Sequence, residues 1–212
     1  SERYPRPAER LKAAKRKLHQ IHGAFLQGKD LTKVEKLVAE IAPGASENAL
    51  HSTCREILEF HASTRERVQM LDQLFPELLA SAGHIRALLD CACGLNAFAF
   101  PWMKLPGDAR YIGTDINNRL VSVINDFFSR ASLPAEALCH DLLCGPPPCK
   151  ADVALLLKVL PTLEQQHRGA AVQVLNTIRD VCLVRCAIVS FPARSLGGHY
   201  RGMNEYYRMF MD

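Results

Sequence analysis

The sequence has no long hydrophobic run and no internal repeat. Its 212 residues are 48% hydrophobic and 23% charged, and no apolar stretch approaches the roughly 20 residues that a membrane helix needs. The first 17 residues are polar and basic, so they lack the apolar core of a signal peptide. These absences argue against a membrane protein and against wholesale disorder, and they predict a globular chain that binds no membrane.

A recognisable zinc-binding pattern is also missing, although eight cysteines are present. Several of them lie in apolar, strand-like runs, where a free cysteine behaves as a small buried hydrophobe. Without an export signal, we expect reduced thiols and a cytoplasmic protein. The Cys-x-Cys and Cys-x4-Cys spacings are not those of familiar zinc sites, so we expect no metal. The alternative is a zinc site formed by Cys91, Cys93, His140, Cys144 and Cys149.

The net charge of +4 is modest, but positive charge is concentrated at the start of the chain. Residues 1–17 hold seven basic residues against Glu2 and Glu9. A clustered positive end suits a polyanion such as RNA, and a solvated helix face is an equally good interpretation. The predicted RNA-binding residues are Arg10, Lys12, Lys15, Arg16 and Lys17.

The hydrophobic periodicity changes near residue 84. Before it, helical spacing predicts helices over residues 7–24, 30–42, 46–60 and 64–80. The capping-box spacing of Ser63-Thr64-Arg65-Glu66 predicts the start of the last of these helices. After it, short apolar runs predict strands over residues 85–91, 110–114, 136–143, 152–160 and 186–191. This alternation predicts a parallel sheet, so we expect a helical domain of residues 1–83 and a Rossmann-like α/β domain of residues 84–212.

A candidate cofactor loop follows the first predicted strand. The strand ends at Asp90 and leads through two cysteines to Gly94, and ligands of open parallel sheets bind beyond the carboxyl ends of the strands. Gly94 allows close approach of the backbone to a ligand, because it has no Cβ. The second strand ends at Asp115, 21 residues after Gly94. An acid at this spacing can accept hydrogen bonds from both ribose hydroxyls of an adenosine.

The single glycine of this loop distinguishes between two adenosine cofactors. The sequence lacks G-x-G-x-x-G, so nothing is shaped to pack a pyrophosphate against a helix N-terminus. A loop with an acid at Asp90 and one glycine at Gly94 instead suits a methionine ammonium, which favours S-adenosylmethionine over NAD. Asp141 follows the third strand and is predicted to bind the adenine edge. The alternative for Asp141 is a loop acid that caps the following turn.

Two patterns that would indicate other methyl acceptors are missing or misplaced. No Asn/Asp-Pro-Pro-Tyr/Phe tetrad for an exocyclic amine is present, and Pro148-Cys149 precedes the fourth strand, the wrong end for a cytosine C5 nucleophile. Guanine N7 fits, because its free lone pair needs only placement and desolvation. Lys158 is then a candidate for contact with RNA phosphate and Glu164 for orienting a base edge. A snorkelling lysine and an early-turn helix acid are the alternatives.

Four segments in this order resemble the Arm-type aminoglycoside-resistance methyltransferases. The resemblance runs from Leu11 to Met209. It implies a class I methyltransferase fold that transfers a methyl group from S-adenosylmethionine to N7 of guanine 1405 of 16S rRNA in the 30S subunit, leaving S-adenosylhomocysteine. It also implies resistance to drugs such as gentamicin and kanamycin. The segments are His61-Ala62-Ser63-Thr64-Arg65-Glu66-Arg67, Leu89-Asp90-Cys91-Ala92-Cys93-Gly94-Leu95-Asn96, Lys158-Val159-Leu160-Pro161 and Phe191-Pro192-Ala193-Arg194-Ser195-Leu196-Gly197-Gly198.

The same resemblance implies roles for individual residues. Arg67 would grip the methionine carboxylate, Asp90 and Gly94 would hold the methionine end, and Asp115 and Asp141 would bind ribose and adenine. The full implied cofactor set is His61, Thr64, Arg67, Asp90, Cys91, Gly94, Asp115, Ile116, Asp141 and Leu142. The residues implied to handle RNA or the target base are Lys158, Glu164, Arg194, Ser195 and Met203, and the basic N-terminal region would dock on ribosomal RNA.

The chain departs from this family at both ends. Family members begin some tens of residues before Ser1, and their sheet finishes with an antiparallel strand pair. This chain stops at Asp212 within a predicted helical stretch, residues 204–211, so we expect that pair to be absent and one sheet edge to be open. Cys91 stands where relatives often carry an aliphatic residue, which we interpret as packing variation.

We expect a monomer. Two other hypotheses remain open: a small-molecule methyltransferase whose N-terminal helices form a substrate lid, and a non-catalytic RNA-binding module with a degenerate methyltransferase fold.

Overall fold

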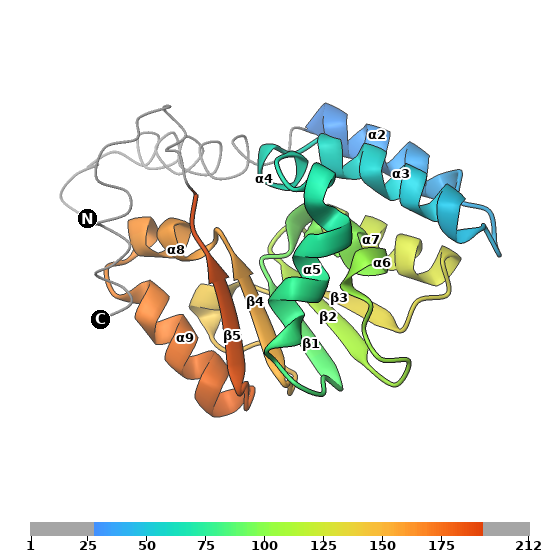
Figure 1. Ribbon diagram of the computed structural model, residues 1–212. Coiled ribbons are helices and arrows are strands. Elements are labelled where there is room, and N and C mark those ends of the chain that lie inside the picture. Colours follow the sequence, from blue (N-terminus) through green and yellow to red (C-terminus); the bar gives the residue numbers. More distant parts are fainter. Residues whose placement is uncertain (1–27, 193–212) are drawn as a thin grey trace, which may run out of the picture.

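Five parallel strands form the centre of the molecule (Figure 1). The computed structural model describes residues 28–192. Its strands are hydrogen-bonded in the order β3-β2-β1-β4-β5, and every pairing is parallel, which confirms the predicted sheet. The order changes direction between β1 and β4, the kind of position at which open α/β sheets bind ligands. The strands are β1 (Ala87–Cys91), β2 (Arg110–Asp115), β3 (Ala135–Cys139), β4 (Val153–Leu157) and β5 (Cys186–Ser190).

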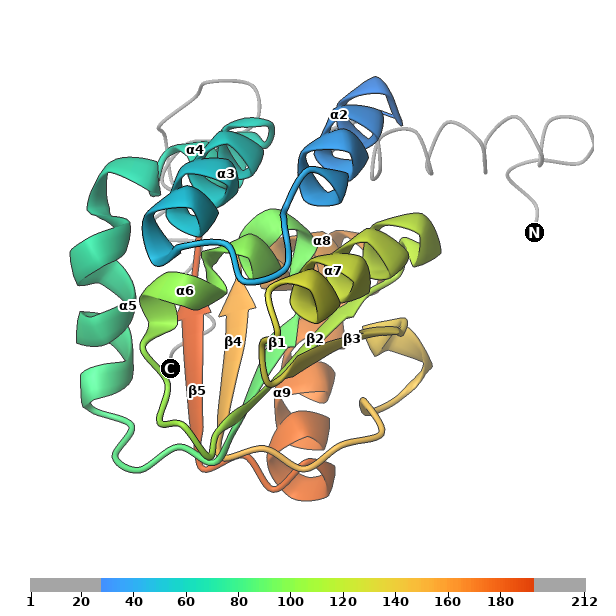
Figure 2. The ribbon, with the colours of Figure 1, turned by 90° about the vertical axis from the view of Figure 1, so that its right-hand side faces the viewer.

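Helices cover both faces of this sheet. In Figure 2, α9 (Ala170–Val181) lies behind the strands, whereas α5 (Leu71–Ala80), α6 (Phe100–Met103) and α7 (Asn118–Arg130) lie in front. Successive strand residues point to opposite faces, so Leu88 joins the core beneath α5 and α7 and Leu89 joins the core beneath α8 (Leu160–Gln166) and α9. Both faces are therefore buried, which is why the strands read as continuous apolar runs.

Two predicted strands end earlier than expected. The third ends at Cys139 rather than at residue 143, because Asp141 caps a 3-10 helix, η3 (Leu142–Cys144). The fourth ends at Leu157 rather than at residue 160, because Lys158 takes the left-handed conformation, with φ +64°. That conformation cannot continue a strand. Both errors lie at the carboxyl edge of the sheet.

The helix predicted over residues 64–80 is wrong as a single element. It is divided into α4 (Ala62–Arg65), a 3-10 helix η1 (Val68–Met70) and α5. The predicted capping box does not form, because α4 is capped by His61, whose Nδ1 accepts from the Ser63 amide at 3.3 Å. The predicted helices over residues 7–24 and 204–211 lie outside the described residues. No helix in the described part is long and apolar enough to span a membrane.

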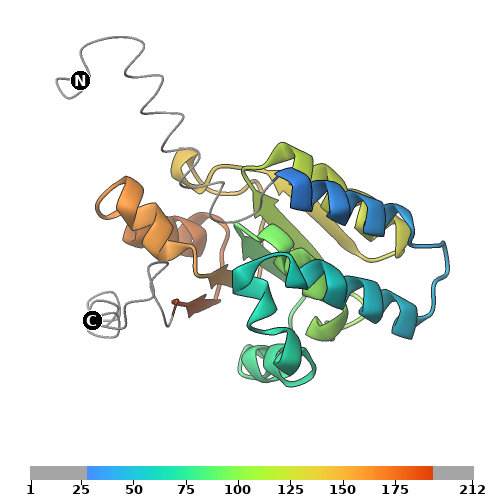
Figure 3. The same cartoon turned by 90° about the horizontal axis from the view of Figure 1, so that it is seen from above.

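The helices α2 (Gly28–Ala39) and α3 (Glu47–Glu59) lie above the carboxyl edge of the sheet (Figures 1 and 3). Their buried residues belong to the same hydrophobic core as α5, α7 and β1. Arg119 of α7 donates to both carboxylate oxygens of Glu35 at 2.6 Å and to Thr32 at 2.9 Å. Packing is thus continuous across residues 83 and 84. The division into a docking domain (1–83) and a methyltransferase domain (84–212) stays a prediction.

Asp152 joins the starts of β4 and β1 at the amino edge of the sheet. Its Oδ2 accepts from the amides of Arg86 and Ala87 at 2.7 and 3.0 Å. Arg185, which leads into β5, donates to the carbonyls of Ala82 and His84 and lies 3.8 Å from Asp152. The backbone hydrogen bonds, first that from Arg86, hold the pKa of Asp152 below its usual value.

Replacement of Asp152 by alanine should lower the free energy of unfolding by about 1–2 kcal/mol at neutral pH, because two strand-end amides lose their acceptor. Since the folded-state pKa is depressed, this contribution is present above the unfolded-state pKa and disappears as the pH falls through the folded-state value. Urea denaturation at pH 7 and pH 3 tests this. Asp108→Ala, at a well-exposed acid in the loop before β2, is the control. Equal stability of Asp152→Ala and wild type at pH 7 would contradict the prediction.

Candidate functional site

The loop after β1 is built from two left-handed residues and is attached to β2. Ala92 has φ +53° and Gly94 has φ +51°. The Cys93 amide donates to the Thr114 carbonyl at 2.8 Å, and the Gly94 amide donates to the Asp115 carboxylate at 3.1 Å. A left-handed conformation at alanine is unfavourable, and such strain is typical of functional loops held by their surroundings.

Asp90, at the end of β1, is only 1% exposed. One of its carboxylate oxygens, Oδ2, accepts hydrogen bonds from the Asn96 amide nitrogen and the Tyr111 hydroxyl, both at 2.7 Å. Burial raises the pKa of Asp90 to about 6, although the hydrogen bonds from Asn96 and Tyr111 and the charge of Arg67 act in the opposite direction. A buried carboxyl with a pKa near neutrality that feels the charge of a half-buried cation is typical of functional sites.

Three residues that support Asp90 were missed in the sequence: Asn96, Tyr111 and Gly113. Asn96 is 3% exposed in the 3-10 helix η2 (Gly94–Ala99), and Tyr111 is fully buried. A Cβ built on Gly113 would lie 3.0 Å from the Cys93 sulfur and 3.2 Å from a ring carbon of Tyr111. The signal was present as a glycine inside a strand, which often marks close approach of other groups.

The acids that follow β2 and β3 are engaged with the backbone. Asp115 accepts from the amides of Gly94 and Asn117, the latter at 2.9 Å. Asp141 accepts from the Leu143 amide at 2.9 Å and caps η3. For Asp141 the structure therefore shows the turn-capping alternative. The parallel strands nonetheless bring Asp90, Asp115 and Asp141 to one edge of the sheet.

Apolar side chains accompany these acids. Ile116, directly after Asp115, is 46% exposed. Leu142 is only 7% exposed and belongs to the core beneath α8 and α9, whereas its neighbour Leu143 is 39% exposed. Leu143 is therefore better placed than Leu142 to present an apolar surface at this edge. Cys91 is likewise buried in the core beneath α9, as expected for a packing variation.

The short α4 segment brings an arginine to the same edge. Arg67 donates through Nε to the Ser63 carbonyl at 2.9 Å, and its pKa is lowered mainly by burial while Asp90 and Glu66 oppose this. Thr64 is 3% exposed, and its hydroxyl donates to the Leu58 carbonyl at 2.6 Å, so its role here is to join α4 to α3. Burial, and then the charges of Arg67 and Lys158, lower the pKa of His61 to about 4.

Of the residues predicted to handle RNA, the two that the structure describes, Lys158 and Glu164, lie in different surroundings. Lys158, at the end of β4, donates to the carboxylate of Glu66. Glu164 lies within α8 and accepts from the amides of Gly169 and Ala171 at 2.7 and 3.3 Å. Both of its carboxylate oxygens thus cap the start of α9. Glu164 is thus a helix acid that joins α8 to α9, and its contact with a base edge stays a prediction.

Cysteines form no metal centre in the described residues. Within residues 28–192, no group of three or more cysteine, histidine or acidic side chains is placed to hold a metal ion. Cys149 lies in the loop before β4, at the amino edge of the sheet. Burial and the neighbouring Cys182 raise its pKa to about 11, so it is a poor nucleophile.

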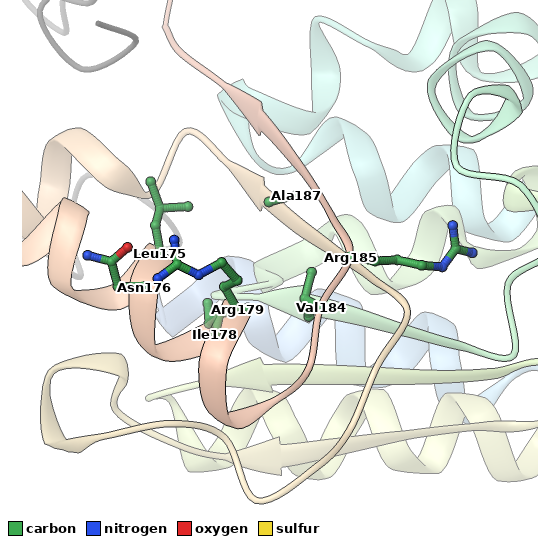
Figure 4. A pocket seen from close by; sticks show the side chains of 7 residues that line it. All are labelled: Leu175, Asn176, Ile178, Arg179, Val184, Arg185 and Ala187. Carbon is green, nitrogen blue, oxygen red and sulfur yellow. The ribbon is translucent and has the colours of Figure 1, made fainter.

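A pocket outside this site lies beside β5 (Figure 4). It measures about 240 Å³ and is lined by side chains of α9 and of the start of β5, including Ile178, Arg179 and Ala187. The pocket lies towards the amino end of β5, away from Asp90, Asp115 and Asp141 at the carboxyl edge. Arg194, Ser195, Met203 and the predicted basic residues Arg10, Lys12, Lys15, Arg16 and Lys17 lie outside the described residues.

The sheet order, the loop after β1 and the acid at the end of β2 define a Rossmann-like fold of the class I methyltransferase type. The ribosomal RNA methyltransferase (FmrO) family model matches residues 6–212. The chain therefore belongs to the FmrO family, which confirms the resemblance found in the sequence.

Named relatives and solved structures agree. The chain is 35% identical over 199 residues to a 16S rRNA (guanine(1405)-N(7))-methyltransferase of Micromonospora rosea, covering 93% of this chain and 71% of the relative. It is 34% identical over 210 residues to a protein of the same name from Serratia marcescens, covering 99% and 76%. The solved structure of 16S rRNA methyltransferase RmtF with S-adenosyl-L-homocysteine has 33% identity and a TM-score of 0.81, covering 99% and 76%.

Replacement of Gly113 by alanine should destabilise the folded protein by about 1–3 kcal/mol, because the added Cβ displaces Cys93 and the ring that carries the Tyr111 hydroxyl. Thermal and urea denaturation measure the loss. Gly107→Ala is the matched control, since its Cβ would meet nothing within 4 Å. If both variants were as stable as wild type, the tight packing behind Asp90 would be refuted.

Proposed function

We propose that this chain transfers the methyl group of S-adenosylmethionine to N7 of guanine 1405 of 16S rRNA in the 30S subunit, and that it acts in the cytoplasm as a monomer. Relatives that match most of the chain carry this activity in their names. The observation in the structure that carries the proposal is the pair of acids, Asp90 and Asp115, on either side of a left-handed loop at the carboxyl edge. Resistance to gentamicin and kanamycin is the expected consequence.

The residues at this edge fit S-adenosylmethionine. A Cβ on Gly94 would meet nothing within 4 Å, so the loop borders open space. Asp90 and Arg67 would hold the ammonium and carboxylate of the methionine end. Asp115 would bind the ribose, and Ile116, Asp141 and the exposed Leu143 would surround the adenine. The bound cofactor supplies an electrophilic methyl group.

The protein's part in the reaction is then placement. Guanine N7 carries a free lone pair and needs no base, which is consistent with a site whose acids are engaged by hydrogen bonds. Most of the acceleration would come from alignment of N7 with the methyl group and from exclusion of water. Lys158, at the end of β4, would contribute a positive charge beside the RNA. A base within a helix would have to be extruded, at a cost of a few kcal/mol.

A small-molecule methyltransferase with a helical lid is less well supported. The helices α2 and α3 share a continuous core with the sheet, whereas a lid must move apart from it. The named relatives act on rRNA.

Incubation with 30S subunits and radiolabelled S-adenosylmethionine should yield one N7-methylguanine, located by borohydride and aniline cleavage with primer extension. Asp115→Ala should abolish both transfer and cofactor binding by isothermal titration, whereas Asp108→Ala should leave both intact. Transfer should weaken steeply with salt, because RNA docking releases counterions. Methyl transfer to small molecules without ribosomes would contradict the proposal, as would cofactor binding without transfer to 30S subunits.

Cofactor affinity should depend on pH through Asp90. Its pKa of about 6 means that it gains its charge between pH 5 and pH 7, and only the charged form attracts the methionine ammonium. The dissociation constant should therefore rise about tenfold as the pH falls from 7 to 5. His61, with a pKa of about 4, stays neutral over this range. Isothermal titration at both pH values should show a weaker and pH-independent affinity for Asp90→Asn; a pH-independent wild type would refute the assignment.

A further inference from the structure

An ion pair joins the end of β4, where the RNA is proposed to bind, to the turn after α4 that carries the proposed cofactor ligand Arg67. The Lys158 ammonium, at the end of β4, donates to the carboxylate of Glu66, which directly follows α4. The lysine side chain is 17% exposed and that of the glutamate is 52% exposed. The two residues are 92 positions apart in the sequence, so the contact is made by the fold and not by local chain geometry.

The backbone of Lys158 is held in place as well as its side chain. Its φ of +64° lies in the left-handed region, which is unfavourable for a residue other than glycine. Its amide donates to the Ser190 carbonyl at the end of β5 at 2.9 Å. A strained backbone persists only where the surroundings fix it. The lysine is therefore held at both ends, by β5 and by Glu66.

Glu66 lies between two arginines whose side chains have other partners. Arg65 donates to the Glu59 carbonyl at 2.7 Å and pairs with the Glu59 carboxylate at 3.5 Å. Arg67 donates to the Ser63 carbonyl. The charges of Arg65, Arg67 and Lys158 all act on His61 in one direction, and that of Glu66 acts in the other. Glu66 is thus the counter-charge that pairs with Lys158 within this group of cations.

We propose that Glu66 is a positioning residue: it holds the Lys158 ammonium beside the turn that carries Arg67, so that the charge offered to the RNA is fixed relative to the cofactor. This inference rests on the proposed function. The Glu66 carboxylate is half exposed, and an ion pair whose carboxylate is open to water contributes little to stability. Loss of Glu66 should therefore leave the fold intact and change the reaction.

The test compares Glu66→Ala, Glu66→Gln, Lys158→Met and the double variant Glu66→Ala/Lys158→Met. Glu66→Ala should lower kcat for 30S methylation about tenfold, with the melting temperature and the Kd for S-adenosylmethionine nearly unchanged. Glu66→Gln, which keeps an acceptor oxygen, should recover part of the loss. The double variant should be no slower than Lys158→Met alone, because each substitution removes the same Lys158–Glu66 interaction. Glu59→Ala, which removes the neighbouring exposed pair, should behave as wild type.

A second measurement does not depend on activity. Acetylation of Lys158 by a small reagent, followed by mass spectrometry, should be slow in wild type and several-fold faster in Glu66→Ala. Equal acetylation rates, or kinetic losses that multiply in the double variant, would overturn the positioning role. If wild type binds the cofactor but does not methylate 30S subunits, the proposed function fails, and the acetylation rates still decide whether Glu66 positions Lys158.

Discussion

Burial of the Asp90 carboxylate is the constraint on which the proposed cofactor site at the carboxyl edge of the sheet depends. A carboxylate removed from water is costly unless hydrogen bonds replace its hydration, and Asn96 and Tyr111 supply them from the following 3-10 helix and the adjacent strand. Each donor requires its own element to lie at a fixed distance from β1. Gly113 provides the room, because a side chain there would contact Cys93 and Tyr111. The position of the loop after β1 is therefore set by the hydrogen bonds that the buried Asp90 carboxylate requires.

The geometry of that loop then brings the rest of the edge together. With β1 and β2 in register, the Gly94 amide reaches Asp115, and two left-handed residues turn the backbone towards open space. On the other side of β1, the left-handed Lys158 ends β4 and pairs with the residue after α4. Strain at these turns is compensated by the buried core beneath both faces of the sheet. The groups proposed to hold the cofactor and those proposed to contact the RNA are thereby attached to one sheet.

The sequence predicted the parallel sheet, the approximate positions of the helices over residues 30–42 and 46–60, and acids at the strand ends (Asp90, Asp115 and Asp141), because apolar periodicity and strand-end acids are local signals. It did not predict where the strands end at Cys139 and Leu157, since a side-chain cap and a left-handed lysine decide those points. Residues 64–80 were predicted as one helix that starts at a Ser63 capping box. In the structure His61 instead caps the separate short helix α4. Tyr111 and Glu66 act through contacts between segments that are far apart in the sequence, and such contacts leave no mark in local spacing. The contacts of Glu164 were missed for a different reason: its partners are backbone amides at the start of the next helix, which side-chain patterns do not mark.

A crystal structure of this chain with S-adenosylhomocysteine tests the central claim most directly. The account predicts the adenosine at the carboxyl edge, with its ribose on Asp115, its adenine beside Ile116 and Leu143, and its amino acid end between Asp90 and Arg67. The Asn96 and Tyr111 hydrogen bonds to Asp90 should remain unchanged. Cofactor bound elsewhere, or bound at this edge without contact to Asp90 and Asp115, would contradict the account.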